Sequence, residues 1–364
     1  MREKQKAFRG ALLGLAVGDA MGCTVDRKTL QEICADYGPN GLLGYDLANG
    51  YAEVSSYTQL AAFCANALLL GLTRRQMQNR NIPLIRYIGV ALREWSRSQQ
   101  YSAPERNYCW LSTVPELKRR RCMDTRMLDA LSRETLGTPE EPVYRNDQPS
   151  ALTEVVPAAL LGSILEMEQD EVNRLAADMV ALTHGDPQAF LSGAVLAHGI
   201  SMLLKEPNIG VEELLRNTVD SIALQFGRQY GLGHIWELLQ MAQILAASET
   251  VSPMEAMERL QCRTASEVLA GVLYACLTCH GDFDTAMITA VNHSGRSAAV
   301  GAITGMVLGL RLGEDALPDF YMESLEPVDL LRELADDLAQ AGVLDQMSRL
   351  FDDDWDRKYL HGGL

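Results

Sequence analysis

Aromatic residues make up only 6% of this chain of 364 residues, and alternating strand patterns are scarce along it. Both shortages argue against a fold built on β-sheets. Glycine and methionine are instead plentiful, with 29 and 15 copies, and hydrophobic residues reach 47%. A core of Ala, Leu, Val, Met and Gly suits closely packed helices, so the sequence predicts an all-α fold.

Positive charge is also in short supply, because 32 Lys and Arg residues stand against 48 Asp and Glu residues, for a net charge of −16. Proteins that bind nucleic acid normally present a basic face to the phosphate backbone. We therefore expect no nucleic-acid partner. One basic run, Lys118–Arg121, is interpreted as a solvated helix face, with a local anion site as the alternative.

Long uncharged apolar runs are missing as well. No stretch reaches the roughly 18 uncharged apolar residues that a membrane span needs, so we expect no membrane partner. The start of the chain, "MREKQKAFRG" followed by "ALLGLAVG", has the pattern of a signal peptide. Its apolar run is short and ends at Asp19, so we assign it to the fold and not to targeting.

The eight cysteines do not form the compact framework of a small secreted protein. Most lie inside apolar helical patterns, where a free thiol acts as a small hydrophobic side chain. The cysteine pattern therefore predicts a reducing, cytoplasmic location. The positions are 23, 34, 64, 109, 122, 262, 276 and 279.

Helical periodicity dominates the chain, and short connections with turn residues separate the periodic segments. No low-complexity linker or break in composition divides them, so we expect one domain over residues 1–364. The tail from 351 to 364 is predicted as a peripheral helix followed by a frayed end. The other predicted helices are 8–21, 58–72, 83–98, 124–134, 153–166, 170–183, 187–204, 211–225, 235–247, 264–279, 283–292, 297–312 and 327–341.

Two of these helices carry stripes of glycine. In the first the glycines are at 10, 14, 18 and 22, and in the late one at 301, 305, 309 and 313, with Ser297 one step before. A spacing of four puts each set on one helix face. Glycine costs a helix up to about 1 kcal/mol relative to alanine, so a close approach between helices must offset that cost. We infer that both helices are central and can pack against each other, which would bring Asp19 and Asp26 near Arg296.

Several short motifs suggest chemistry but have simpler structural interpretations. "CLTCH" at 276–280 has the spacing of a haem attachment site, yet two core thiols and a helix-terminal histidine explain it. "GDFDT" at 281–285 could hold a metal, but Asp282 is placed to cap a helix and Asp284 falls in its first turn. In "THGDP" we expect His184 to cap the carbonyls of the outgoing helix and Asp186 to open the next one.

Taken together, five segments resemble the signatures of the ADP-ribosylglycohydrolase family, in the family's order. The resemblance covers about residues 7–313, leaving 314–364 as a C-terminal extension, and implies a compact, orthogonal multi-helix bundle. The segments are "FRGALLGLAVGDAMGCTVD", "YTQLAAFCANALLLGL", "GTPEEPVYRNDQP" with "LTEVVPAALLG", "ALTHGDPQAFLSGAVLAHGI" and "DFDTAMITAVNHSGRSAAVGAITGMVLGLRLG".

The family is known for removing ADP-ribose from modified protein side chains or hydrolysing related compounds. Its members use two magnesium ions, held by a T-D-D motif and by D-T-D-T in the last signature, and an acid after the first motif commonly assists. In this chain Asp19 matches the first motif and Asp26 replaces that assisting acid. All four metal-binding carboxylates are missing, because the corresponding positions hold Ser55, Ser56 and Tyr57 in one motif and Arg296, Ser297, Ala298 and Ala299 in the other.

These replacements predict that the family's magnesium is absent. Magnesium is held by carboxylates and water, for which neutral hydroxyls are no substitute. The guanidinium of Arg296 keeps its charge in proteins, and at about 4 Å it would repel a divalent ion by several kcal/mol at an effective dielectric of about 20. Arg296 could instead hold Asp19 or Asp26, or bind a phosphate directly. The Gly-rich loop is also altered, to Gln148–Leu152 followed by Thr153 and Glu154.

The sequence therefore favours a pseudoenzyme that binds ADP-ribose, a related nucleotide or an ADP-ribosylated protein. One alternative is a metal-independent hydrolase, with Asp26 or Asp19 as the general base and Arg296 stabilising an anion. A structural or partner-binding scaffold and a conventional magnesium-dependent hydrolase are the others. The candidate ligand-binding residues are Ser55, Ser56, Tyr57, Arg296, Ser297 and His184.

Overall fold

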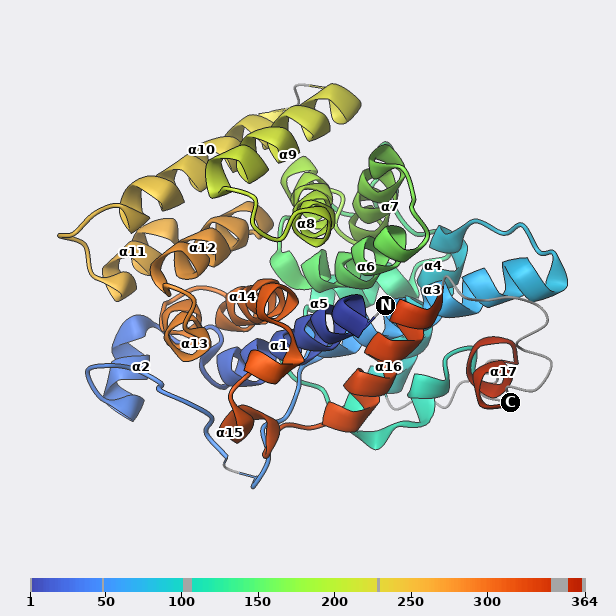
Figure 1. The fold of residues 1–364 in the computed structure, drawn as a ribbon, viewed down its shortest axis with the longest axis horizontal. Coiled ribbons are helices and arrows are strands. Elements are labelled where there is room, and N and C mark those ends of the chain that lie inside the picture. Colours follow the sequence, from blue (N-terminus) through green and yellow to red (C-terminus); the bar gives the residue numbers. More distant parts are fainter. Residues whose placement is uncertain (1, 48, 101–106, 228–229, 342–352, 362–364) are drawn as a thin grey trace.

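The chain folds as an assembly of helices, in the computed structural model that describes residues 2–47, 49–100, 107–227, 230–341 and 353–361 (Figure 1). Within these ranges there is no β-strand, and one isolated parallel bridge joins Ala52 to Leu325. The predicted all-α class is confirmed. The α-helices are α1 (Arg2–Val25), α2 (Leu30–Tyr37), α3 (Ser56–Gln78), α4 (Leu84–Gln99), α5 (Thr125–Ser132), α6 (Val156–Ile164), α7 (Gln169–Ala181), α8 (Pro187–Lys205), α9 (Val211–Phe226), α10 (Tyr230–Ala246), α11 (Pro253–Leu260), α12 (Ala265–Thr278), α13 (Phe283–Val291), α14 (Ser297–Leu312), α15 (Asp319–Met322), α16 (Val328–Gln340) and α17 (Asp353–Tyr359).

Every helix predicted between residues 8 and 341 has a counterpart, with one difference in kind. The segment predicted as one helix over 153–166 is a 3₁₀ helix, η3 (Pro149–Val155), followed by α6. Pro157 explains the break, because proline has no N–H to donate and is tolerated only in the first turn of an α-helix. The other 3₁₀ helices are η1 (Trp110–Thr113), η2 (Pro115–Lys118) and η4 (Glu314–Ala316).

The sequence analysis missed the short helices α2, α11 and α15. Each has at most eight residues, too few to show a clear periodicity, although a capping box between Thr29 and Glu32 opens α2. In the tail, α17 corresponds to the predicted peripheral helix, and the predicted frayed end lies outside the described residues. The interpretation of 118–121 as a helix face was wrong, because Lys118 ends η2 and Arg119 and Arg121 pair with Glu53.

Helices α1 and α14 lie side by side at the centre of the molecule (Figure 1), and their two glycine stripes face each other. A Cβ atom added to Gly18 would come within 3.0 Å of the carbonyl group of Gly301, closer than real Cβ atoms approach backbone. The same holds for Gly10 opposite Gly309, Gly14 opposite Gly305 and Gly22 opposite Ser297. The predicted contact between the striped helices is confirmed. It places the C-terminal end of α1 and the N-terminal end of α14 near Asp26.

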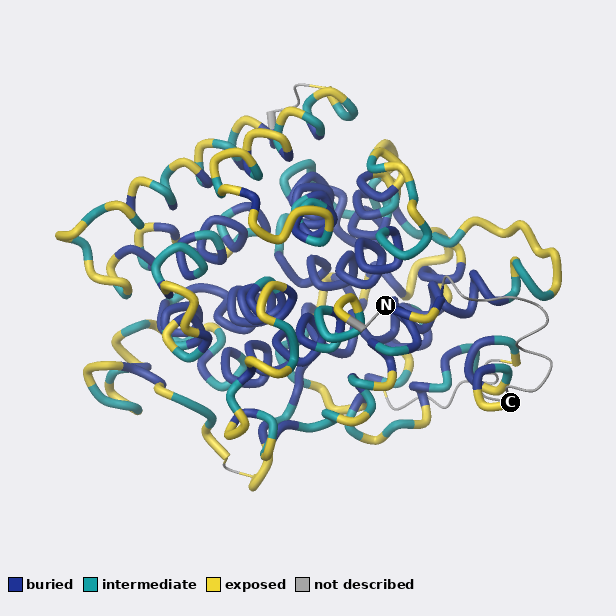
Figure 2. Tube along the Cα trace, in the orientation of Figure 1, coloured by how far each residue is buried: buried dark blue, intermediate teal, exposed yellow. Residues whose placement is uncertain are grey.

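Two helices are long and apolar enough to cross a membrane by length and composition alone, namely Glu3–Val25 within α1 and Pro187–Lys205, which is α8. The sequence analysis overlooked them because it counted uncharged residues only. Inside the fold, 83% and 72% of their most apolar windows are buried. Core helices pass the same test, as do signal sequences near an N-terminus. Figure 2 shows that α1 and α14 are buried, whereas α2 and α10 keep exposed faces.

The described residues beyond 313, namely 314–341 and 353–361, include two helices that pack on the rest of the fold. Helix α16 contacts α1 and α6, and α17 contacts α3. Trp355 of α17 is buried and donates a hydrogen bond of 3.1 Å from its indole nitrogen to Thr73. Asp337 of α16 accepts hydrogen bonds from Tyr359 and Lys358 at 2.6 and 3.2 Å. The single-domain organisation over 1–364 stays a prediction.

Candidate functional site

Asp19 lies fully buried on α1 and closes the first turn of α3. Its carboxylate accepts hydrogen bonds from the backbone N–H of Ser55 at 2.8 Å and of Thr58 at 3.0 Å, and from both of their hydroxyls. Burial raises the pKa of Asp19, and these four hydrogen bonds oppose that rise. Asp19 thus contacts Ser55 and Thr58 and not Arg296 as expected, because all its hydrogen bonds go to the N-terminus of α3.

The hydroxyls that replace the family's metal ligands are used inside the protein. A strand-like stretch of backbone, residues 119–122, crosses the first turn of α3. Ser56 donates from its backbone N–H to Arg121 O at 3.2 Å and from its hydroxyl to Cys122 O at 3.0 Å. The Tyr57 ring is buried, which raises the pKa of its phenol, and Thr153 donates to its carbonyl at 2.7 Å. These contacts commit the first turn of α3 to the fold.

A cleft of about 550 Å³ opens beside this turn. Four arginines line it, together with Asp124, Gln148 and the backbone at Ser294 and Gly295. We call it the arginine cleft; its arginines are Arg27, Arg126, Arg263 and Arg296. Among the described residues, neither the Arg126 nor the Arg263 side chain has an ion-pair partner. In a protein of net charge −16, this cleft is therefore a local concentration of positive charge.

Arg296 enters the cleft from the N-terminus of α14. Its Nη1 lies 3.3 Å from Asp26 Oδ2, and its Nε donates to Gln148 Oε1 at 3.2 Å. The two charged side chains are only 9% and 3% exposed. Asp26 also accepts from the Ala298 N–H at 3.2 Å, so it caps α14. Burial raises the pKa of Asp26, while Arg296 and Ala298 lower it. The expected approach of Asp26 to Arg296 is confirmed.

Ser297, the next candidate, begins α14 and is buried. Its hydroxyl donates to the carbonyl of His293 at 3.3 Å, and its own carbonyl packs against Gly22. Ser297 therefore serves the contact between α1 and α14 and does not line the cleft.

His184 lies behind the cleft wall and holds Asp124. Its Nε2 is 2.7 Å from Ser150 Oγ and 3.2 Å from Asp124 Oδ2, and Thr183 Oγ1 is 2.7 Å from its Nδ1. The expectation that His184 caps carbonyls was wrong, because both ring nitrogens bind side chains. Serine and aspartate also share one ring nitrogen, so the three do not form a catalytic triad, in which they occupy opposite ring nitrogens.

Asp124 is a site residue that the sequence analysis missed, although the predicted helix over 124–134 begins there. Its carboxylate accepts from Ser150 at 2.8 Å and Asn146 at 3.0 Å, and it caps α5 through the Arg126 N–H. Burial alone would raise the pKa of Asp124, but the hydrogen bonds from His184, Ser150 and Asn146 outweigh it and hold that pKa well below its usual value. Asp124 is thus an ionised carboxylate at the edge of the arginine cleft.

The remaining motifs have structural roles. Asp282 caps α13 through the Thr285 N–H, as predicted, and Asp284 accepts a hydrogen bond of 2.6 Å from Tyr321. The thiols of Cys276 and Cys279 lie in the packing of α12. Within the described ranges, no three His, Cys, Asp or Glu side chains lie together as a metal site would require.

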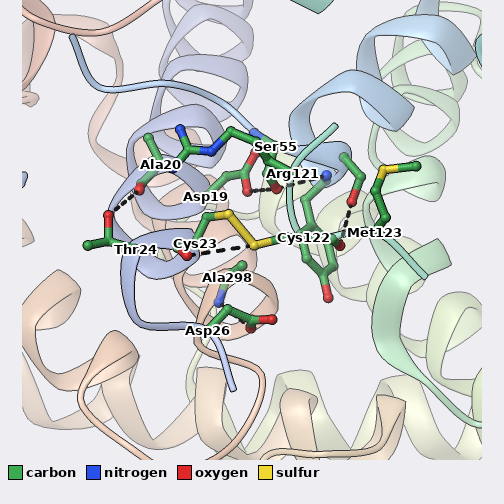
Figure 3. Close-up of a disulfide and its surroundings, with 12 residues drawn as sticks. Asp19, Ala20, Cys23, Thr24, Asp26, Ser55, Arg121, Cys122, Met123 and Ala298 are labelled. Carbon is green, nitrogen blue, oxygen red and sulfur yellow. Dashed lines mark hydrogen bonds between the residues drawn. A yellow bond between two sulfur atoms is a disulfide. The ribbon is translucent and has the colours of Figure 1, made fainter. Parts of the chain in front are cut away.

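Cys23 and Cys122 are joined by a disulfide that closes 99 residues of chain (Figure 3). Cys23 lies in the last turns of α1, and Cys122 follows the 3₁₀ helix η2. The sequence analysis treated the thiols as free side chains and did not foresee this pair. Six other cysteines are free, and the cytoplasmic location stays a prediction.

The sequence model of the ADP-ribosylglycohydrolase family matches residues 1–346. The chain belongs to the ADP-ribosylglycohydrolase family. This match confirms the resemblance and carries it past residue 313. A solved structure described as an "ADP-ribosylglycohydrolase-related protein complex" superposes with a TM-score of 0.60 at 21% identity, covering 94% of this chain and 100% of that one. At that identity the likeness shows the fold. The comparison with curated proteins found no match.

Where the family's Gly-rich loop ends in Met-Arg, this member has a buried glutamate. Glu154 is fully buried in η3, and its carboxyl oxygens have no hydrogen-bond partner among the described residues. Burial raises the pKa of Glu154 well above its usual value. Folding is therefore favoured by the protonated carboxyl, and this part of the stability is lost as the pH rises above the unfolded-state pKa of about 4.3.

Glu154→Gln is expected to become more stable than the parent protein as the pH rises from 5 to 8. The difference in free energy of unfolding should grow by up to about 1.4 kcal/mol per pH unit, because glutamine has no proton to lose. Urea unfolding at pH 5, 6.5 and 8 measures it. The control is Glu140→Gln, at a side chain that is 74% exposed. Parallel pH profiles for Glu154→Gln and the parent would contradict an uncharged, buried Glu154.

Proposed function

We propose that this family member is a pseudoenzyme that binds the diphosphate of ADP-ribose, or of a related nucleotide, in the arginine cleft without magnesium. The observation that carries the proposal is the cleft itself, where four arginines meet and two of them, Arg126 and Arg263, lack an ion-pair partner among the described residues. Guanidinium groups bind phosphate oxygens through paired, charge-assisted hydrogen bonds. A diphosphate therefore fits the charge of the cleft.

The residues around the cleft do not fit the family's two magnesium ions. Two carboxylates remain from the family's motifs, and both are committed: Asp19 accepts four hydrogen bonds from α3, and Asp26 binds Arg296 and caps α14. Magnesium needs carboxylate oxygens that can coordinate it. The guanidinium of Arg296 brings a positive charge to the place of the lost aspartates. We therefore derive no reaction step through a metal.

A second candidate function is metal-independent hydrolysis, and Asp124 is the observation that favours it. This carboxylate is ionised and lines the arginine cleft, whereas neither of the two bases suggested by the sequence, Asp19 and Asp26, lies in its lining. Its position beside the proposed nucleotide site is the point in its favour, although its lowered pKa makes it a weak base toward water. Release of ADP-ribose that persists in excess chelator would support hydrolysis over binding alone.

Titration calorimetry with ADP-ribose, in excess chelator, tests the proposal. We expect saturable binding to the parent protein, and about tenfold weaker binding for Arg126→Ala and for Arg263→Ala, because each variant loses a charge-assisted hydrogen bond worth about 1.5 kcal/mol. Arg216→Ala, at an exposed arginine of α9 away from the cleft, is the matched control and should bind as the parent does.

Three outcomes would contradict the proposal in different ways. A rise in melting temperature with millimolar magnesium, together with magnesium-dependent release of ADP-ribose, would indicate a conventional hydrolase. The absence of any ADP-ribose binding would favour the structural or partner-binding role. Equal losses of affinity for Arg216→Ala and the two cleft variants would place the binding outside the arginine cleft.

A further inference from the structure

The disulfide joins the two sides of the arginine cleft. Cys23 lies four residues before Arg27, and Cys122 lies four residues before Arg126. Met123 and Asp124, which lie between Cys122 and Arg126 in the sequence, also line the cleft wall. The bond between the cysteines therefore holds together two segments that each carry a cleft arginine. Since like charges repel, some restraint must keep these segments close when no anion is bound.

We call residues 119–124 the bridge segment, because they connect the first turn of α3 to the cleft. Gln59 donates to Arg119 O at 2.8 Å, and Ser56 donates to Arg121 O and Cys122 O. On the cleft side, Arg27 Nη2 donates to Met123 O at 3.0 Å. Figure 3 shows the disulfide at the middle of this arrangement, with Asp19 and Ser55 on one side and Asp26 and Ala298 on the other. It is the one covalent link from the bridge segment to α1.

Two observations suggest that the bridge segment can rearrange when this link is broken. Cys122 has a φ of 47°, in the left-handed region that residues other than glycine rarely adopt. Breaking the bond removes the covalent restraint that holds this conformation. Both cysteines are also only half-buried, unlike the buried Cys64, Cys109, Cys262 and Cys279, so the disulfide lies nearer to solvent than those four thiols.

We propose that Cys23 and Cys122 form a thiol–disulfide switch that sets the anion affinity of the arginine cleft. This inference rests on the proposed function, since it regulates the same site. In the oxidised protein the bond keeps Arg27 and Arg126 close enough to share one diphosphate. In the reduced protein the bridge segment loosens, the two guanidinium groups move apart, and the anion is bound less tightly.

The chemistry requires two thiols from the reductant, and a dithiol supplies both. Its first thiolate attacks one sulfur of the Cys23–Cys122 bond, which forms a mixed disulfide and releases the other cysteine as a thiol. The second thiol of the reductant then attacks the mixed disulfide and releases the remaining cysteine. The protein gains two electrons and two protons, and the dithiol becomes a disulfide. Exchange with an oxidised dithiol reverses both steps.

The test is calorimetric titration of the full chain with ADP-ribose before and after reduction by dithiothreitol, with the state of the cysteines read by mass spectrometry after alkylation. We expect the Kd to rise about tenfold on reduction. Cys23→Ser/Cys122→Ser should show the weaker affinity with and without dithiothreitol. Cys34→Ser, at a free and partly exposed cysteine of α2, is the matched control and should respond as the parent does.

Hydrogen exchange of residues 119–126 in the parent protein provides a readout that needs no ligand. It also tests the switch if the double cysteine variant folds poorly, because that variant is not needed. Faster exchange in this segment on reduction of the parent protein is expected. Unchanged exchange would overturn the switch, whatever the affinity does. Unchanged affinity in a protein that binds ADP-ribose would overturn it as well. Faster exchange without any ADP-ribose binding would refute the proposed function and leave the redox control of the bridge segment standing.

Discussion

Gly18→Ala is expected to destabilise the protein by about 4 kcal/mol or more, among the largest effects of a single methyl group. The added Cβ would meet the carbonyl group and the following backbone nitrogen of residues 301 and 302, all under 3.0 Å away. Backbone cannot move aside as a side chain does, so α1 and α14 would have to separate along the whole stripe. Chemical denaturation measures the loss directly, and the melting temperature should fall by roughly 5 °C.

Gly199→Ala is the matched control, because Gly199 also lies inside a helix and a Cβ there would meet no atom within 4 Å. This variant should be unchanged or more stable by up to about 1 kcal/mol, the gain in helix propensity of alanine over glycine. Similar stability of Gly18→Ala and Gly199→Ala would show that the two central helices are not in backbone contact.

Features that depend on local spacing could be predicted from the sequence. The glycine stripes gave the central helix pair, since a spacing of four has a direct meaning on a helix. The caps formed by Asp186 and Asp282 followed from the position of an acid before an apolar segment. The family followed from several motifs in order, and the approach of Asp26 to Arg296 followed from pairing the two stripes.

The arginine cleft could not be predicted, because its residues come together only in three dimensions. Arg27 follows α1, Arg126 lies in the first turn of α5 and Arg263 lies between α11 and α12. Nothing in their local sequence separates them from other surface arginines. The cysteine pair has the same difficulty, with 99 residues between its members. Asp124 had a weak signal as the residue before a predicted helix, but its hydrogen bonds with Ser150 and His184 join distant segments.

Ser56, which stands where the family resemblance places a metal-binding aspartate, also holds the bridge segment. Aspartates at 56 and 57 would place negative charge beside the carbonyl oxygens of Arg121 and Cys122, which now accept hydrogen bonds from Ser56. The hydroxyl of Ser56 donates to the Cys122 carbonyl, which an ionised carboxylate could not do, whereas the hydrogen bond to Arg121 O comes from the backbone N–H and needs no serine. Under the proposal of a metal-free cleft, the serine at 56 therefore has a second role, since its hydroxyl fixes the backbone at Cys122 over the first turn of α3.

Arg296→Ala is expected to lower the free energy of unfolding by about 3 kcal/mol at neutral pH and to weaken ADP-ribose binding by at least a hundredfold. The stability loss arises because Asp26, with a side chain only 3% exposed, would lose its buried partner and keep only Arg27, at 3.5 Å and 56% exposed. The affinity loss arises because the innermost guanidinium of the cleft is gone and its charge no longer offsets the carboxylate of Asp26 behind it. Urea unfolding and calorimetric titration measure the two effects.

Adding Asp26→Asn to Arg296→Ala separates the contribution of Arg296 to stability from its contribution to ADP-ribose binding. The double variant should recover most of the stability, because an amide at position 26 carries no buried charge and can still accept the Ala298 N–H, but it should not recover the binding. The defect of Arg296→Ala should also shrink on acidification, since burial already raises the pKa of Asp26 and loss of Arg296 raises it further. Below the unfolded-state pKa of about 3.9 the carboxyl is protonated in both states and the penalty disappears. Arg216→Ala again serves as the control. A defect in stability that does not change with pH would show that Arg296 does not pair with Asp26. Recovery of affinity in the double variant would show that Arg296 does not contact the anion.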